Sequence, residues 1–367
     1  MKIGILTYHR VINVGAILQT FCAFEFFKSL GCEVEIIDLR NLVTERNEKR
    51  KLVSIKKLSI NLKQIKKLKS IRKFAKNRLK YSSIVNSGDT KKFANFCKKQ
   101  NYDIVSVGSD TVWEMRKNGY ATLNVNEFFL EHYNGKKMSF SASMDPINDI
   151  DHFKDLIKKR SAVINKFDFV GVRDSITKSV LSSYGTSSYH TCDPTILMMD
   201  HPIFAVKQSK RESLGIQLRK ELAEELSLKI NMQKVFINGN GPEAMNYDPA
   251  WTIEKYLDAL NANKYIITDR FHGAILSLLV SRAEIPVIFL EDKFKWSEKN
   301  SKIRDLAQRL DVEEFVCSSV NDSFSILKKL YNGELIWDRV KVLTRLANMS
   351  VDTRNLLTEK IQNIYVN

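Results

Sequence analysis

The feature that most constrains this fold is a strand that passes directly into a helix, and the clearest example lies between residues 264 and 280. The β-branched and aromatic run Tyr265–Thr268 is typical of a buried strand. Strong helix formers follow in the apolar run Ala274–Leu279. Because such units alternate along most of the chain, the sequence predicts parallel strands with helices packed against them.

The turn between these two runs, residues 269–273, combines residue types that suit an anion. Arg270 offers a guanidinium that can bind a carboxylate or a phosphate through two hydrogen bonds. His272 can move a proton near neutral pH. A helix that begins near Gly273 directs its first N–H groups and the positive end of its dipole toward a ligand. Arg270 or His272 alone would be interpreted as an ordinary surface or packing residue, but together on one turn they predict a site.

The alternation of strands and helices defines two halves, with a linker expected near residues 200–202. The first half contains expected strands at Ile3–Thr7, Val34–Ile37, Asp103–Val107, Met138–Ala142 and Phe167–Val172, and expected helices at Ala16–Leu30, Phe93–Lys99 and Ile176–Ser183. The second half contains an expected charged helix at Glu212–Ile230, strands at Lys234–Ile237, Tyr265–Thr268 and Ile285–Leu290, and a helix from Asp248 to Leu260. We therefore predict an N-terminal domain at residues 1–200, a C-terminal domain at 201–320, and a helical tail at 321–367 that packs back on the N-terminal domain.

Polar residues follow two of the strands expected in the first half. Ser109 and Asp110 come directly after Asp103–Val107, and Arg173 comes directly after Phe167–Val172. Arg173 repeats the arrangement of Arg270, an arginine where a strand gives way to a helix. Asp110 leaves two interpretations open, because it could orient or deprotonate a hydroxyl group or simply cap a helix.

Two further loops are expected at the carboxyl ends of strands. Asn13 and Gly15 lie in the loop after the first strand, and Asn240 lies in a glycine-rich loop after Lys234–Ile237. Glycine at such a loop allows a ligand to approach the backbone closely. The first β-α-β unit has no G-x-G-x-x-G, so the sequence gives no sign of a dinucleotide site.

The net charge of +16 comes almost entirely from one segment, a basic helical arm within residues 48–81 of the N-terminal domain. From Lys49 to Lys80 there are fourteen lysines and arginines and no acid, and the rest of the chain is left near neutrality. Apolar residues recur there every three or four positions, which predicts one or two amphipathic helices; they are Leu52, Ile55, Leu58, Leu62, Ile65, Leu68 and Ile71.

This arm has two interpretations that the sequence leaves open. It could be the solvated face of a helix packed on the domain, or a peripheral attachment to an anionic membrane surface. Nucleic acid is not expected as a partner, because Phe74 is the only aromatic residue of the arm and neither zinc-finger spacing nor an RNP motif occurs.

Other classes of protein are disfavoured by simple patterns. No run of 18 apolar residues is present, and the N-terminus lacks the pattern of a signal peptide. The five cysteines are scattered and do not have the spacing of metal ligands, so no metal site is expected. We therefore expect a cytoplasmic protein, either free or peripheral at the inner face of the membrane.

Seven segments spread over roughly residues 1–310 carry a family resemblance. They are MKIGILTYHRVINVGAILQTF at the N-terminus, KFAKNRLKYSS at the end of the arm, VGSDTVW at 107–113, SFSAS at 139–143, VGVRDS at 170–175, CDPTIL at 192–197 and ITDRFHGAILSLL at 267–279. In order and spacing, they resemble the polysaccharide pyruvyl transferase family. Two positions depart from its pattern, Thr111 in place of Gln and Glu114 in place of Asn, and they bear on the acceptor more than on the reaction class.

The resemblance implies two Rossmann-like domains that face each other across a cleft, as in GT-B glycosyltransferases. It implies phosphoenolpyruvate as donor substrate, a glycan or lipid-linked saccharide of the bacterial surface as acceptor, and no cofactor. We assign His272 as general acid and Asp110 as the second catalytic candidate. The donor would be bound by Arg270, Arg173, Gly273 and Ser109, and the cleft or acceptor site would be lined by Asn13, Gly15 and Asn240.

Two other function classes are compatible with the same pattern. A chain with this architecture could be a glycosyltransferase that uses a nucleotide sugar, because fold does not fix function. It could also be a basic binding module that has lost its chemistry, although the presence of both Arg270 and His272 counts against this interpretation.

Overall fold

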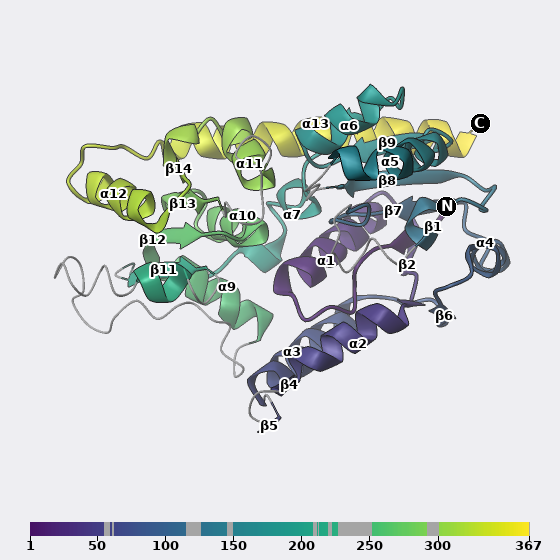
Figure 1. Cartoon of the computed structure of the whole chain (residues 1–367), viewed down its shortest axis with the longest axis horizontal. Helices are drawn as coiled ribbons and strands as arrows, with labels where there is room; N and C mark the ends of the chain where they lie inside the picture. The colour runs from purple at the N-terminus through teal and green to yellow at the C-terminus, as the bar shows by residue number, and fades with distance from the viewer. Residues whose placement is uncertain are drawn as a thin grey trace. The chain divides into compact units, whose positions relative to one another are not determined.

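The computed structural model describes residues 1–54, 59–60, 62–114, 126–144, 150–207, 211, 213–218, 222–226, 252–291 and 301–366. They form two compact units: Met1–Met198 together with Met349–Asn367, and Met199–Asn348. Each unit contains a parallel sheet with helices packed on it (Figure 1). The predicted fold class, an α/β chain with two Rossmann-like domains, is confirmed.

The first unit is built on a six-stranded sheet in the order β10-β9-β8-β7-β1-β2, and all neighbouring strands are parallel. Its strands are β1 Lys2–Leu6, β2 Glu33–Ile36, β7 Ile104–Val107, β8 Lys137–Ala142, β9 Phe169–Val172 and β10 Tyr189–His190. The five strands expected in this half are therefore present. The chain leaves β1 toward β2 and then returns to the other side of β1 with β7. The carboxyl ends of β1 and β7 thus meet at the switch point where such sheets bind ligands.

Helices cover both faces of this sheet. One face packs against α1 Val14–Ser29, α7 Pro194–Leu197 and the end of α13 Arg339–Val366, and the other against α4 Thr90–Lys99, α5 Ile150–Ile164 and α6 Ser175–Ser183. On the first face, the rings of Phe26 and Phe27 in α1 each lie 6.0 Å from the ring of Phe140 in β8. The strands are buried on both faces, but only some of them are mostly apolar in the sequence: β7 is IVSV and β9 is FVGV, whereas β2 is EVEI and β8 is KMSFSA.

The basic arm forms two helices, α2 Leu42–Lys51 and α3 Leu62–Arg78, joined by the antiparallel pair β4 Val53–Ser54 and β5 Ser59–Ile60. A second small pair, β3 Leu39–Arg40 with β6 Val85–Asn86, ties the two ends of the arm together. α3 packs on α1, where the ring of Phe74 lies 5.3 Å from the ring of Phe21. The predicted basic helical insertion is confirmed.

The second unit contains a four-stranded parallel sheet in the order β11-β12-β13-β14. Its strands are β11 Ser213–Gln217, β12 Asn263–Thr268, β13 Val287–Leu290 and β14 Val316–Cys317. Its helices are α9 Ile253–Asn261, α10 Phe271–Val280, α11 Lys302–Leu310 and α12 Val320–Tyr331. Short 3-10 helices occur at Pro202–Phe204 and Glu313–Phe315 in this unit and at Asn126–Phe129 in the first unit.

The helix expected at Glu212–Ile230 is wrong over its first part, because Ser213–Gln217 forms strand β11. Ile216 is fully buried and pairs in parallel register with Ile267 of β12. The surrounding charges favoured a helix, but the sheet edge supplied by β12 decides the conformation of this short segment. Residues 222–226 are helical. The strand expected at Lys234–Ile237 and the loop with Asn240 lie outside the described residues.

The C-terminal segment divides between the units. α12 packs in the second unit through Phe324 and Leu327, whereas the later part of α13 packs on the first unit. There Thr353 Oγ1 accepts a hydrogen bond from the backbone N–H of Cys192 at 2.9 Å. Residues 321–348 therefore lie with the second unit, where the sequence prediction placed them in a separate tail.

Candidate functional site

The carboxyl edge of the second sheet carries the turn that the sequence predicted as a site. β12 ends at Thr268 and α10 begins at Phe271, so Arg270 occupies the N-cap position of the helix. The Arg270 side chain makes no capping hydrogen bond. α10 therefore begins without a side-chain cap, and an anion is a partner that such a helix start accommodates.

The guanidinium of Arg270 lies at the surface of the second unit. The side chain is 55% exposed, and its Nε lies 3.0 Å from Oδ1 of Asp269, whose side chain is only 3% exposed. The ion pair lies at the Nε side of the guanidinium, and the two terminal nitrogens have no partner among the described residues. An exposed guanidinium with two unoccupied terminal nitrogens can bind a carboxylate or phosphate through two hydrogen bonds.

Gly273 allows the first turn of α10 to approach the ends of two strands. A Cβ atom at this position would lie 2.7 Å from Oγ1 of Thr268 and closer still to Oε1 of Gln217 at the end of β11. Both side chains are buried, so a larger residue would push the helix away from the strand ends. The hydroxyl of Thr268 also accepts from Arg270 N at 3.0 Å and donates to Gln217 O at 3.1 Å, which holds the backbone just before the helix.

His272 is the second residue of α10, two positions after Arg270. Its side chain is half-buried, and its ring centroid lies 5.5 Å from that of the buried Phe271. The turn thus places a largely exposed guanidinium and an imidazole within three residues of each other. The roles that the sequence assigned to Arg270 and His272 stay predictions.

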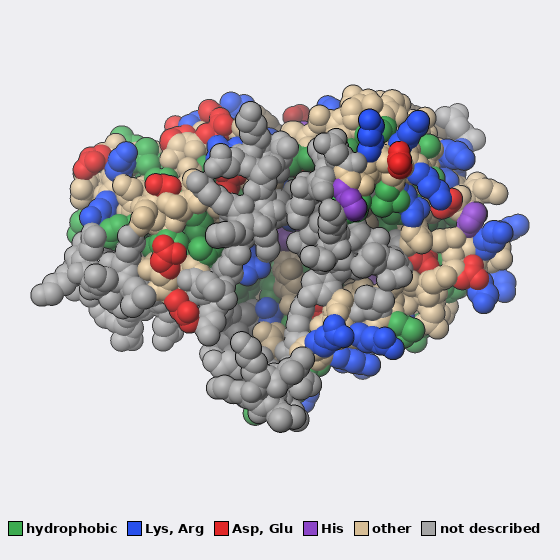
Figure 2. Space-filling view, viewed as in Figure 1, with side chains coloured by type: hydrophobic (Ala, Val, Ile, Leu, Met, Phe, Trp, Pro, Cys, Tyr) green, Lys and Arg blue, Asp and Glu red, His purple; other side chains and the backbone are tan. Residues whose placement is uncertain are grey.

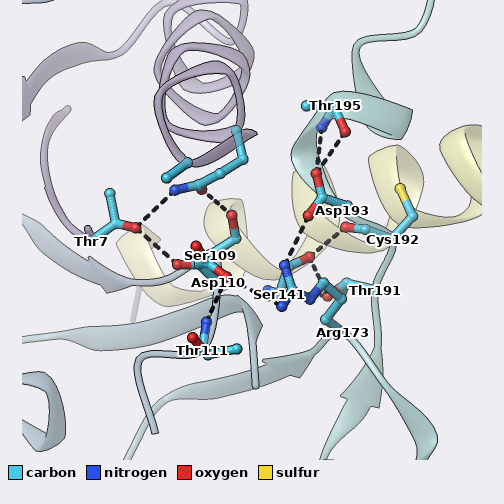
Figure 3. A network of polar contacts seen from close by, with 12 residues as sticks. Thr7, Ser109, Asp110, Thr111, Ser141, Arg173, Thr191, Cys192, Asp193 and Thr195 are labelled. Carbon is cyan, nitrogen blue, oxygen red and sulfur yellow. Dashed lines mark hydrogen bonds and ion pairs between the residues drawn. The ribbon is translucent and has the colours of Figure 1, made fainter. Parts of the chain in front are cut away.

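Arg173 lies at the centre of a buried polar network in the first unit (Figure 3). Its Nη1 lies 3.1 Å from Oδ2 of Asp193, and its Nη2 lies 3.3 Å from Oδ1 of Asp110. Asp193 also accepts hydrogen bonds from the backbone N–H and the hydroxyl of Thr195. Asp110 Oδ1 accepts from the N–H of Thr111 at 2.9 Å. The network joins the ends of β7 and β9 to the start of α7.

The charge of Arg173 is maintained by its neighbours. Burial opposes this charge, since the side chain is 1% exposed, but the carboxylates of Asp110, Asp193 and Asp174 raise the pKa of Arg173 above its ordinary value. The donor contact assigned to Arg173 from the sequence stays a prediction, because this guanidinium already bridges two carboxylates. Asp110, with a side chain 16% exposed, is the most exposed of the three bridging groups.

The two arginine-bearing turns differ in the order of their charged residues. In the first unit Arg173 precedes Asp174, which is the N-cap of α6 and accepts from the N–H of Thr177 at 2.8 Å. In the second unit Asp269 precedes Arg270, so the arginine occupies the N-cap position. α6 is therefore capped by its own carboxylate and α10 is not. Of the two turns, the one at α10 is better suited to an external anion.

Ser109 lies in the loop that follows β7, and two hydrogen bonds hold it there. Its hydroxyl donates to Oε1 of Gln19, and its carbonyl accepts from the hydroxyl of Thr7 at 2.8 Å. The preceding Gly108 has φ of 106°, and a Cβ there would collide with the carbonyl of Phe140. This glycine lets the loop lie directly on β8. The donor contact assigned to Ser109 from the sequence stays a prediction.

The residues expected to line the cleft have local structural roles where they are described. Asn13 is the N-cap of α1, and its Oδ1 accepts from the N–H of Gly15 at 2.9 Å. Gly15 is buried in the first turn of that helix. Asn240 lies outside the described residues. Their assigned roles toward an acceptor stay predictions.

Sequence reasoning missed a cluster around Asp38, directly after β2. Asp38 Oδ1 lies 3.2 Å from His9 Nε2 and 3.4 Å from Arg10 Nη1, and Oδ2 lies 3.1 Å from Arg40 Nη2. The other ring nitrogen of His9 lies 3.0 Å from the carbonyl of Thr7, so both nitrogens face oxygen acceptors. The signal was present, because His9 and Asp38 each follow a strand and neighbouring parallel strands end at one edge.

This cluster borders a small hollow at the carboxyl end of β1. The hollow has a volume of about 30 Å³, is open to solvent on one side, and is lined in part by Tyr8, His9, Arg10 and Glu45. Burial opposes the ionised form of Asp38, but hydrogen bonds from His9 and Arg40 and the charge of Arg10 hold the pKa of this carboxyl well below its ordinary range. The first loop is therefore fixed to β2 by an ionised aspartate.

Comparisons with known proteins give both a family and structural similarities. The model of the family described as polysaccharide pyruvyl transferase matches residues 13–291. No curated protein matches the sequence. Similar solved structures include an α-glucosyltransferase in complex with UDP and a 13-mer DNA, at 11% identity over 100% of both chains with a TM-score of 0.43. They also include TarM, at 10% identity over 100% of this chain and 99% of the other with a TM-score of 0.48.

The two arginines should differ sharply in their effect on stability. Arg173→Ala should lower the free energy of unfolding by about 3–5 kcal/mol, because two carboxylates in a buried network lose their cation. Arg270→Ala removes a side chain that is 55% exposed but lies beside the buried carboxylate of Asp269, so it should lower the free energy of unfolding by only about 1 kcal/mol. Urea denaturation followed by circular dichroism measures both values. Equal, small losses would contradict the structural role of the Arg173 network.

The Asp38 cluster predicts a pH dependence of stability. A carboxyl whose pKa is depressed in the folded state contributes stability above its unfolded pKa of about 3.9, and this contribution disappears as pH falls through the folded value. Asp38→Asn should therefore lower the free energy of unfolding at pH 7, and its difference from wild type should shrink below about pH 4. Denaturant titrations at several pH values test this. A difference that stays constant down to about pH 3 would show that the carboxyl is not depressed.

Proposed function

Because the chain belongs to the polysaccharide pyruvyl transferase family, we propose that it transfers the pyruvate group of phosphoenolpyruvate to a sugar of a bacterial surface polysaccharide and forms a ketal. One observation carries the choice of donor site: an exposed guanidinium, a helix start without a side-chain cap and a histidine all lie on the turn from Asp269 to Gly273. Phosphoenolpyruvate carries a carboxylate and a phosphate, and this turn supplies groups that complement both kinds of anion.

Arg270 and the first turn of α10 each bind one of the two anionic groups of the donor. The terminal nitrogens of Arg270 bind one anionic group through two parallel hydrogen bonds. The start of α10, with its partial positive charge, holds the other group. The ion pair with Asp269 restricts the side chain of Arg270, which lowers the conformational entropy that is lost when the donor binds.

His272 is the proposed general acid. Its proton goes to C3 of the enol double bond, which becomes a methyl group and leaves positive charge at C2. A sugar hydroxyl attacks C2 and releases its proton, and phosphate then leaves. A second hydroxyl of the same sugar attacks C2, loses its proton and closes the ketal. The overall reaction consumes one phosphoenolpyruvate and one diol and releases one phosphate.

Asp110 is the proposed partner of the acceptor hydroxyl in the first unit. Its carboxylate is partly exposed, and Arg173 and the N–H of Thr111 fix its orientation. A carboxylate held in this way can orient or deprotonate a hydroxyl group. Arg173 then acts as a positioning residue, because its guanidinium anchors Asp110 to the buried Asp193.

The reaction is tested by phosphate release from phosphoenolpyruvate in the presence of candidate surface glycans. Release should require both substrates, and mass spectrometry should show a glycan that carries a pyruvate ketal. Parallel incubations with nucleotide sugars test the alternative. If the glycan gains a sugar unit from a nucleotide sugar and no pyruvate from phosphoenolpyruvate, the chain is a glycosyltransferase and the proposal fails.

His272→Gln should keep the fold and lower turnover by about 10²-fold or more, with a much smaller effect on donor binding. His132→Gln is the matched control, because His132 is exposed on the first unit and lies outside the proposed donor turn. Steady-state kinetics at saturating donor, together with donor titration by calorimetry, separates turnover from binding. Near wild-type turnover in His272→Gln would remove the assignment of His272 as acid.

A further inference from the structure

The helix α3 uses one face to pack on the first unit. Ile71, Phe74 and Ala75 are buried, and Phe74 contacts Phe21 of α1. The apolar stripe expected from the sequence is therefore buried at its Ile71 end. These side chains are not available to a partner, so any further role of α3 belongs to its opposite face.

The opposite face of α3 is a dense array of cations. Lys66, Lys69, Arg72, Lys73 and Lys76 are all exposed. At about 100° per residue they fall within an arc of about 120° that faces away from Ile71 and Phe74. α3 contains no acidic residue, and none of the five forms an ion pair within the described part of the chain. Figure 2 shows lysine and arginine side chains gathered over the region of α2 and α3.

An exposed leucine lies within the same arc. Leu62, one turn before Lys66, is 66% exposed although it is a large apolar residue. Interfacial helices combine cations that contact anionic headgroups with apolar side chains that enter the boundary of the acyl chains. By contrast, proteins that bind single-stranded nucleic acid present aromatic side chains for stacking, and the only aromatic residue of α3, Phe74, is buried.

We propose that the outward face of α3, defined by Leu62, Lys66, Lys69, Arg72, Lys73 and Lys76, binds the surface of an anionic membrane. Each cation close to such a surface strengthens binding about fivefold, and salt weakens the attraction by screening it. Leu62 adds a contact with the apolar boundary. The attachment is peripheral, and among the described residues no helix has the length and apolar character needed to cross a bilayer. This inference does not depend on the reaction proposed above.

Co-sedimentation of the full chain with vesicles tests the proposal. The vesicles contain phosphatidylcholine alone or phosphatidylcholine mixed with phosphatidylglycerol, at low salt and at high salt. The wild type should bind only the anionic vesicles, and binding should fall as salt rises. Changing Lys66, Lys69, Lys73 and Lys76 together to Gln should lower the partition coefficient at least about tenfold.

A matched control separates this face from net charge. Lys154, Lys158, Lys159 and Lys166 are exposed elsewhere on the first unit, and changing all four to Gln removes the same charge. This variant should keep most of the binding. Equal losses in the two quadruple variants would show a general charge effect and overturn the proposal. Circular dichroism of both variants, with unchanged thermal midpoints, shows that each is folded.

Leu62→Ser tests the choice of lipid over nucleic acid without changing charge. It should lower partitioning to anionic vesicles severalfold, because the apolar contact is lost. Partitioning equal to wild type would overturn the contact of Leu62 with lipid. Binding of DNA or RNA that requires the four α3 lysines, without any binding to anionic vesicles, would replace the membrane by a nucleic acid and overturn the proposal.

Discussion

The buried bridge of Arg173 between Asp110 and Asp193 is the interaction on which the carboxyl edge of the first sheet depends. A guanidinium that is 1% exposed is stable only when carboxylates replace its water. The two carboxylates come from the loop after β7 and from the start of α7, so their positions are fixed relative to the end of β9. Through Cys192, next to Asp193, the network also reaches Thr353 of α13. One cation thus positions Asp110 and ties the C-terminal helix to the first sheet.

The order of two charged residues decides which turn is open to a ligand. Both units place an arginine and an aspartate where a strand gives way to a helix. Where the aspartate comes second, as Asp174, it caps its helix and the arginine before it turns to buried carboxylates. Where the aspartate comes first, as Asp269, it pairs with the arginine and the helix begins without a side-chain cap. The reversed order of these two residues therefore separates a buried arginine bound by carboxylates from a largely exposed arginine beside an uncapped helix start.

Sequence reasoning succeeded where a property is local. The strands of the first sheet were identifiable because short runs rich in β-branched, aromatic and other apolar residues end at turn residues such as Gly108 and Asp38. The turn with Arg270 and His272 was identifiable because its members lie within three residues. Reasoning failed where a partner lies far along the chain. Ser213–Gln217 is a strand because β12 pairs with it, and Asp38 joins His9 only because β1 and β2 are neighbours. The burial of Arg173 likewise depends on Asp193, twenty residues later.

The basic arm shows how periodicity determines the faces of a helix without determining how much of each face is covered. The spacing of apolar residues indicated one stripe, but its two ends differ in the structure: Ile71 is 3% exposed and Leu62 is 66% exposed. The aromatic contact with α1 lies at Phe74, in the second half of α3. Leu62, at the start of α3, lies about three turns before Phe74 and is not buried by that contact. Leu62 shares its face with Ile65 and with five cations that form no ion pair within the described part of the chain, and an anionic surface with an apolar boundary would complement both kinds of side chain.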